Sequence, residues 1–142
     1  VLLAAATLRE FGQVVNVWSV TRYNELARQG IAADRERLHA LGGEAENSPY
    51  VAEMLANAGG VFVAASDYQK ALPLSIERWI PGPYTVLGTD GYGLSEARPE
   101  LRNHFEVSAD WISFVALALL AQTNKITPKK ASTFAQKAGL TL

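Results

Sequence analysis

Three short runs of β-branched and aromatic residues lie along the chain and predict β-strands. They are Val14–Val20, Val61–Ala65 and Tyr84–Leu87, and residues of these types favour the pleated backbone of a sheet. Val61–Ala65 is apolar at every position, so both of its faces are apolar. A strand of that kind is typical of a buried parallel sheet.

Helical periodicity fills most of the chain between these runs. Apolar residues that recur at three- and four-residue spacing, together with capping residues, predict helices. The predicted helices cover Val1–Phe11, Thr21–Gln29, Ala32–Leu41, Asp67–Trp79, Pro99–His104 and Ser108–Thr123, and two more begin at Ser48-Pro49 and Thr127-Pro128.

Glycine and proline set the expected ends of these helices. We expect Gly12, Gly30 and Gly139 to end helices, because glycine adopts the positive φ angle of a helix C-terminus without strain. Pro73 is expected to shorten or kink the helix that contains it. Because strands alternate with helices, we predict an α/β fold with a mostly parallel sheet covered by helices on both faces.

Composition narrows the class of protein without selecting an activity. The chain has 142 residues, 49% of them hydrophobic and 19% charged, which indicates one globular domain and excludes a disordered chain. A net charge of −1 gives no reason to expect a nucleic acid or a membrane as partner. There are no cysteines, which excludes disulfides and thiolate metal sites. The apolar run Trp111–Ala121 is shorter than the roughly 20 residues of a membrane span.

Two loops that follow predicted strands carry the candidate binding residues. In open α/β sheets, ligands bind outside the carboxyl ends of the strands. Gly88–Ser95 contains several glycines, which suits either a phosphate cradle or a tight turn, and we favour the turn because the spacing matches neither the dinucleotide nor the P-loop pattern. In the other loop, Ser66 or Asp67 would cap a helix, or Lys70 would hold an anion; we favour the cap. The remaining candidates in Gly88–Ser95 are Thr89, Asp90, Tyr92 and Ser95.

The two histidines give no sign of catalysis or of a metal site. His39 and His104 are not spaced as metal ligands, and the chain has no Gly-x-Ser-x-Gly nucleophile elbow. His104 lies beside Phe105, which indicates a packed or interfacial histidine. His39 lies in a charged helix and is expected to be solvated.

The chain from Ser108 onward differs from the rest in how its apolar and charged residues are distributed. Apolar residues, Trp111 and Phe114 among them, cover nearly the whole circumference of the Ser108–Thr123 helix. Such a helix is buried either in the core of the chain or against another subunit. The stretch from Trp111 to Leu142 has four lysines and no acidic residue, which fits an acidic partner or, as we favour, a solvated face.

Three segments in order resemble a known family. They are Val17–Leu26, Val63–Pro73, and Val86–Ser95 with its continuation to His104–Val107, supported by Arg37-Leu38-His39 and Pro49-Tyr50-Val51. They resemble the C-terminal domain of the homodimeric bacterial pyruvate dehydrogenases. These enzymes are the thiamine-diphosphate decarboxylating components of their complex and are similar to transketolases.

The resemblance implies a fold and a place within a larger enzyme. The fold is a three-layer α/β/α sandwich of the transketolase C-terminal type. Thiamine diphosphate and Mg²⁺ would lie between other domains of a cytoplasmic homodimer, so no catalytic, cofactor or metal residue is carried onto this chain. The chain would serve dimer contact and structural support. The partners implied are the second subunit and the dihydrolipoyl acyltransferase component, with no nucleic acid or membrane.

The resemblance also implies an incomplete sheet. The chain would lack the first two strands of the domain, one of which lies between Val14–Val20 and Val61–Ala65. The strands on either side of that gap would keep unpaired backbone groups. We therefore expect residues 1–142 to be a partial domain of a longer chain, processed or trimmed, since the sequence does not begin with methionine. The alternative is that the strands rearrange or pair with another chain.

Three positions depart from the family pattern. Leu94 stands where the family usually has arginine, Tyr92 where it has phenylalanine, and Ala40 where it has proline. Leucine in place of arginine removes a charge and five hydrogen-bond donors. A paralogue that acts on another 2-oxo acid therefore stays open, as does a stand-alone, non-catalytic interaction module.

Overall fold

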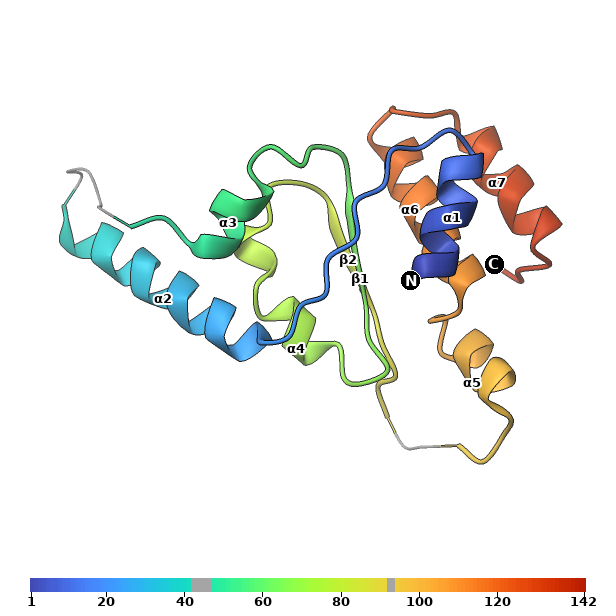
Figure 1. The fold of residues 1–142 in the computed structure, drawn as a ribbon, viewed down its shortest axis with the longest axis horizontal. Helices are drawn as coiled ribbons and strands as arrows, with labels where there is room; N and C mark the ends of the chain where they lie inside the picture. Colours follow the sequence, from blue (N-terminus) through green and yellow to red (C-terminus); the bar gives the residue numbers. More distant parts are fainter. Residues whose placement is uncertain (42–46, 92–93) are drawn as a thin grey trace.

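The computed structural model describes residues 1–41, 47–91 and 94–142, so Tyr92 and Gly93 of the glycine-bearing loop lie outside the described residues, as do residues 42–46. The described chain forms three layers (Figure 1). A parallel sheet of β1 (Phe62–Ala65) and β2 (Tyr84–Leu87) lies in the middle, with Phe62 paired to Tyr84 and Ala65 to Leu87. The α/β class and the parallel pairing predicted from the sequence are confirmed.

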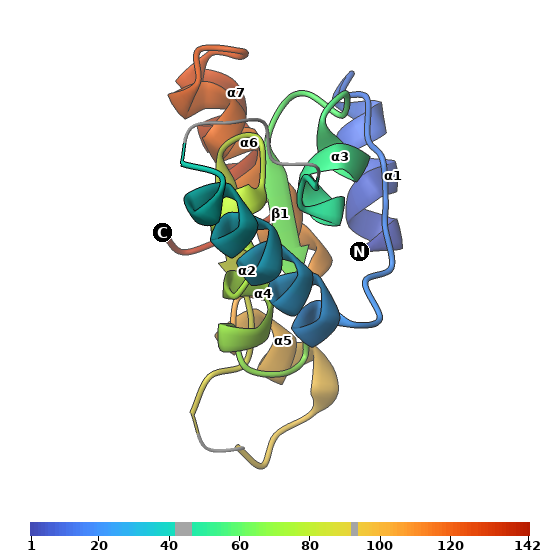
Figure 2. The ribbon, with the colours of Figure 1, turned by 90° about the vertical axis from the view of Figure 1, so that its left-hand side faces the viewer.

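Two groups of helices cover the sheet. On one side lie α2 (Tyr23–His39), α3 (Tyr50–Leu55), α4 (Ala71–Leu74) and the 3₁₀ turn η1 (Glu77–Trp79). On the other side lie α1 (Leu2–Glu10), α6 (Ala109–Gln122) and α7 (Pro128–Lys137), and α5 (Arg98–His104) leads into α6. The view in Figure 2 shows α2 and α4 in front of β1, with α6 and α7 behind it.

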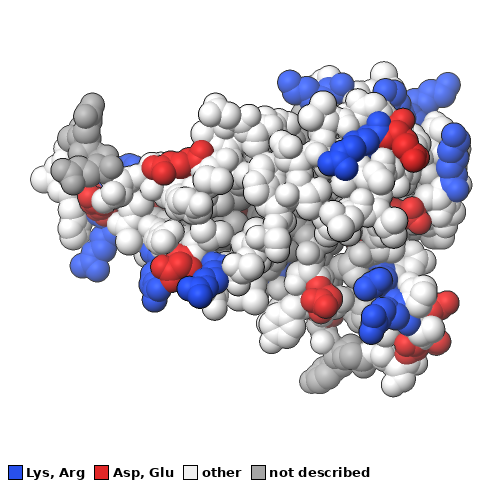
Figure 3. Space-filling view, in the orientation of Figure 1, with Lys and Arg blue, Asp and Glu red and all other residues white. Residues whose placement is uncertain are grey.

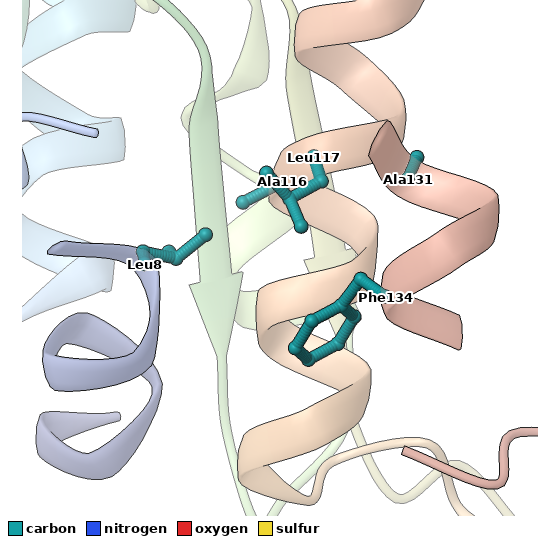
Figure 4. Close-up of a cluster of buried hydrophobic side chains, with 5 residues drawn as sticks. All are labelled: Leu8, Ala116, Leu117, Ala131 and Phe134. Carbon is teal, nitrogen blue, oxygen red and sulfur yellow. The ribbon is translucent and has the colours of Figure 1, made fainter. Parts of the chain in front are cut away.

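The helix predicted at Ser108–Thr123 is the central helix of the second group. Its Leu117 is fully buried, and Figure 4 shows Leu117 and Ala116 of α6 between Leu8 of α1 and Phe134 of α7. Ser108 caps α6 as predicted, because its Oγ accepts a hydrogen bond of 3.3 Å from the Trp111 N–H. Of the two alternatives for this helix, burial in the core of the chain is confirmed; a contact with another subunit stays untested.

The segment Arg98–Gln122 is long and apolar enough, by length and composition, to cross a membrane. The structure divides it into α5 and α6, with a break in which Glu106 has a positive φ of 58°. The apolar character of α6 is accounted for by its packing against α1, α7 and β1.

A second core lies on the opposite face of the sheet. Val51 of α3 and Ile76 pack with Trp79, which is 8% exposed. The Trp79 Nε1–H donates to Asp34 Oδ2 at 2.9 Å, and Arg78 Nε lies 3.3 Å from the same oxygen. These contacts fix η1 against the middle of α2.

The prediction that Gly30 ends a helix is wrong. α2 runs from Tyr23 through Gly30 to His39, joining the two helices predicted as Thr21–Gln29 and Ala32–Leu41. A Cβ on Gly30 would lie 2.6 Å from three indole carbons of Trp79. Gly30 is therefore required by the close approach of the Trp79 ring rather than by a turn. Gly12, with φ of 78°, and Gly139, with φ of 66°, follow helices as predicted.

The single helix predicted over Asp67–Trp79 is also wrong. The segment forms the short helix α4 followed by the 3₁₀ turn η1. The cap predicted at Ser66 or Asp67 is absent from α4, whose N-cap residue is Lys70 and makes no side-chain cap hydrogen bond. Instead Ser66 Oγ accepts a 3.1 Å hydrogen bond from the Tyr68 N–H, which turns the chain directly after β1.

The strand predicted at Val14–Val20 does not form. The segment is extended, but within the described residues no ladder hydrogen bond joins it to the sheet. Its residues have strand propensity and no strand beside them, and propensity alone does not form a ladder. Val14 is 97% exposed and Trp18 is 46% exposed.

Candidate functional site

The two loops predicted to carry binding residues lie together at the carboxyl edge of the sheet. The Lys70 backbone N–H donates to Asp90 Oδ1 at 2.8 Å, and Lys70 Nζ lies 3.8 Å from Asp90 Oδ2. Thr89 Oγ1 donates to the Asp67 carbonyl at 2.8 Å, and the Thr89 N–H donates to the Tyr68 carbonyl at 3.1 Å. The polar groups of the two loops are therefore used largely on each other.

Gly88 is the glycine that this junction requires. A Cβ at Gly88 would lie 2.8 Å from the Tyr68 carbonyl oxygen and 2.8 Å from Lys70 Cγ. Gly91 has φ of 100°, a conformation that disfavours a side chain. These contacts favour the turn over the phosphate cradle. The Lys70–Asp90 pair is exposed by 40% and 52% at its two side chains, and such a surface pair contributes little stability.

The other predicted site residues lie apart from this junction. Trp111 is buried, donates from Nε1 to Asn103 Oδ1 at 3.0 Å, and packs edge-to-face against Phe114. His104 is exposed, with its ring 5.0 Å from that of Phe105. Ser95 is exposed, and Tyr92 lies outside the described residues.

The described residues do not form a site for a divalent metal. Within 1–41, 47–91 and 94–142, no group of three or more histidine or acidic residues is placed to hold an ion.

The sequence reasoning missed an apolar groove of about 600 Å³. Its lining comes from the extended segment 16–22, from α2 and α3, and from β1, with Ile76, Ile80 and Tyr84 completing it. A second cavity of about 350 Å³ continues between residues 13–18 and 58–62. The signal in the sequence was the strand-like Val14–Val20 run, whose apolar side chains have no partner strand in the described chain. The lining includes Val1, Val17, Trp18, Val20, Phe62 and Val63.

Tyr23 and Tyr84 line this groove, and the pKa of each phenol is raised. The Tyr84 hydroxyl donates to the Pro73 carbonyl at 3.0 Å. Burial, with smaller contributions from Tyr23 and Glu77, raises the pKa of Tyr84 far above its usual range. Burial also raises the pKa of Tyr23. Both groups are neutral at ordinary pH, so the groove carries no charge from them.

Charged side chains lie mainly at the two ends of the molecule. Figure 3 shows few Lys, Arg, Asp or Glu atoms over the middle, where segment 12–22 crosses in front of the sheet, and basic side chains at the end that holds α1 and α7. Lys129, Lys130 and Lys137 of α7 are exposed. Whether this face meets an acidic partner or stays solvated, as favoured from the sequence, remains a prediction.

The layers, the parallel pairing and the helix order define an α/β/α domain. The family model of the transketolase-like TK C-terminal domain matches residues 1–108. The chain therefore belongs to this family of transketolase-like C-terminal domains.

Several bacterial relatives, each named pyruvate dehydrogenase E1 component, match most of the chain. The pyruvate dehydrogenase E1 component of Pseudomonas aeruginosa is 42% identical over 96% of the chain, which is 16% of that relative. The component of Corynebacterium glutamicum is 38% identical over 95% of the chain and 15% of the relative. That of Mycobacterium tuberculosis is 40% identical over 84% of the chain and 13% of the relative. The chain thus spans 13–16% of the length of these relatives.

Proposed function

We propose that this chain is the C-terminal domain of a thiamine-diphosphate-dependent pyruvate dehydrogenase (acetyl-transferring). The observation that supports this most strongly is 42% identity over 96% of the chain with a relative named pyruvate dehydrogenase E1 component. The parent enzyme would decarboxylate pyruvate and reductively acetylate a lipoyl group. Thiamine diphosphate, held with Mg²⁺ by other domains, would supply the carbanion chemistry.

In this proposal the chain has a structural role, in dimer contact and in support of the active-site region. The junction of Ser66–Lys70 with Gly88–Asp90 is held by backbone and side-chain hydrogen bonds, so it offers a rigid surface at one sheet edge. Asp67 and Asp90 of this junction are exposed, although the Asp90 carboxylate is held by Lys70, so the junction can present its surface to a neighbouring domain or subunit. The proposed partners are a second subunit and the dihydrolipoyl acyltransferase component, and the proposed location is the cytoplasm.

The test is an assay of the intact protein expressed from its native gene. With thiamine diphosphate and Mg²⁺ present, we expect CO₂ release from pyruvate and reductive acetylation of an oxidised lipoyl group, whose disulfide bond breaks as it takes up two electrons and the acetyl group. Omitting thiamine diphosphate is the control and should abolish both. Absence of activity toward every 2-oxo acid tried would refute an enzymatic parent and leave the stand-alone interaction module.

The departure at Leu94 is the reason to test substrate preference in the same assay. It is 52% exposed and replaces the arginine usual in the family, so an ionic contact at that position is missing. We propose comparing pyruvate with 2-oxobutyrate and 2-oxoglutarate, then repeating the comparison with Leu94→Arg. Pyruvate should be preferred. Preference for another acid would assign the chain to a paralogue.

A further inference from the structure

One side of α7 carries exposed lysines with no acidic residue beside them on the helix. Lys130 and Lys137 lie two helical turns apart on this side, and helical spacing places Lys129 next to Lys130. From Trp111 to Leu142 the sequence has no acidic residue. Figure 3 shows basic side chains gathered at the end of the molecule that holds α7. We define Lys129, Lys130 and Lys137 as the α7 basic face.

Helix stability does not account for the two lysines in the first turn of α7. Lys129 and Lys130 lie near the positive end of the helix dipole, where acidic side chains stabilise a helix and basic ones destabilise it. Thr127 makes no side-chain cap hydrogen bond, and Lys130 occupies the position at which a glutamate would complete a capping box. A local charge conflict of this kind is typical of functional positions.

The lysines of this face are not used to hold the described chain together. Among the described residues, the ion pairs lie on α2, on η1 and at the Lys70–Asp90 junction, and none includes a lysine of α7. The opposite side of α7 packs into the core, where Phe134 is 4% exposed and its ring centroid lies 5.3 Å from that of Phe11. The core therefore takes up the apolar side of α7 and leaves the basic side at the surface.

The side chains around the lysines favour one kind of anionic partner. Thr133 and Gln136 are the other exposed residues on this side, and both are polar. Phe134 is buried, so α7 exposes no ring that could stack on nucleic-acid bases. A helix that lies on a membrane inserts its apolar side into lipid, and that side of α7 is in the core. Lysines are compact, hydrated charges that attract carboxylates without a fixed geometry, which suits an acidic protein surface.

We propose that the α7 basic face is an electrostatic docking surface for a protein partner whose own surface is rich in aspartate and glutamate. The sequence alone favours a solvated face; the charge conflict in the first turn and the lack of ion pairs on α7 among the described residues favour a partner. The contact is a transient one, because exposed ion pairs contribute little stability each and are screened by salt. The inference goes beyond the proposed function, and the face lies outside residues 1–108, which the family model matches.

Binding of a fluorescent oligoglutamate peptide to the intact protein from its native gene tests the proposal. At low salt, we expect Lys129→Gln, Lys130→Gln and Lys137→Gln together to weaken binding by at least about fivefold, because three exposed pairs are lost, and we expect high salt to remove this difference. Arg35→Gln, Arg98→Gln and Arg102→Gln together are the matched control. They remove the same charge from exposed positions on α2 and α5 and should weaken binding by less than about twofold. Unchanged binding in the α7 variant, or an equal loss in the control, would overturn the proposal.

Carbodiimide coupling on the unmodified intact protein gives a second readout that needs no variant. The reagent removes water as an amide bond forms between a glutamate carboxylate of the peptide and a lysine Nζ. We expect the peptide to be attached at Lys129, Lys130 or Lys137, and attachment only at other lysines would overturn the proposal.

Duplex DNA and phosphatidylglycerol vesicles distinguish an acidic protein from other anionic partners. We expect the α7 variant to lose less binding to either of them than to the peptide. An equal or larger loss would overturn the assignment to a protein partner. None of these measurements uses pyruvate or thiamine diphosphate, so failure of this proposal and failure of the proposed function are distinguishable.

Discussion

Replacing Gly30 by alanine tests the contact between α2 and η1. The added Cβ would lie 2.6 Å from Trp79 Cδ2, Cε2 and Cζ2, whereas ordinary carbon contacts begin near 3.5 Å. The indole must move by roughly 1 Å to relieve this overlap. That movement would stretch the 2.9 Å hydrogen bond from Trp79 Nε1 to Asp34 Oδ2 and disturb the packing with Val51 and Ile76.

Whether Gly30→Ala stabilises or destabilises α2 depends on effects that oppose one another. Alanine improves helix propensity over glycine by about 1 kcal/mol. Overpacking of a core costs about 1–3 kcal/mol, and weakening a hydrogen bond to a charged group costs about 1.5–3 kcal/mol. These terms are not additive, and we expect a net loss near 2 kcal/mol in the free energy of opening of α2.

Hydrogen exchange of α2 in the intact protein measures this loss. A loss near 2 kcal/mol should speed the exchange of α2 by roughly 30-fold. Ile31→Ala is the matched control, because Ile31 is 61% exposed on the same helix and its truncation should change stability by less than about 0.5 kcal/mol. In a Trp79→Phe background, Gly30→Ala should cost less. Slower exchange of α2 in Gly30→Ala itself would refute the reasoning, since it would mean that helix propensity alone decides.

Three further predictions follow from caps, turns and phenols. Ser108→Ala should lower the free energy of unfolding by about 1 kcal/mol, measured by urea denaturation, while Thr127→Ala should lower it less because Thr127 makes no side-chain cap bond to α7; equal effects would contradict the cap. Gly91→Ala should destabilise the protein by about 1 kcal/mol or more because of the positive φ, and an unchanged melting temperature would count against this. The raised pKa of Tyr84 means that the folded state holds its proton more tightly, so stability should fall as pH rises above the usual phenol value of 10.0; Tyr84→Phe should flatten that fall, and an identical slope in the variant would rule Tyr84 out as its source.

The sequence predicted those elements whose causes are local. Ser108 caps α6 through an oxygen three residues from its donor, and Gly12 and Gly139 follow helices at positive φ. The strands β1 and β2 form where short apolar runs predict them. Each of these features depends on neighbours within a few residues, which periodicity and capping rules describe.

The errors come from contacts between distant residues. Gly30 lies inside α2 rather than at its end. The residue there is glycine because the ring of Trp79, far along the chain, occupies the space that a side chain would need. Val14–Val20 has the composition of a strand but lacks a partner, and pairing rather than composition makes a ladder. The candidate loops were predicted from their positions after strands. The hydrogen bond from the Lys70 N–H to Asp90 shows that their polar groups bind one another, which their positions in the sequence did not indicate.

The intact mass of the protein produced from its native gene tests the account most directly. The account treats this 15.4 kDa chain as one domain of a protein of about 100 kDa, since it spans 16% of a relative of the same family. A mass near 100 kDa is the predicted result. A mass of 15.4 kDa would contradict the account, because no other domain would then exist to hold the cofactor.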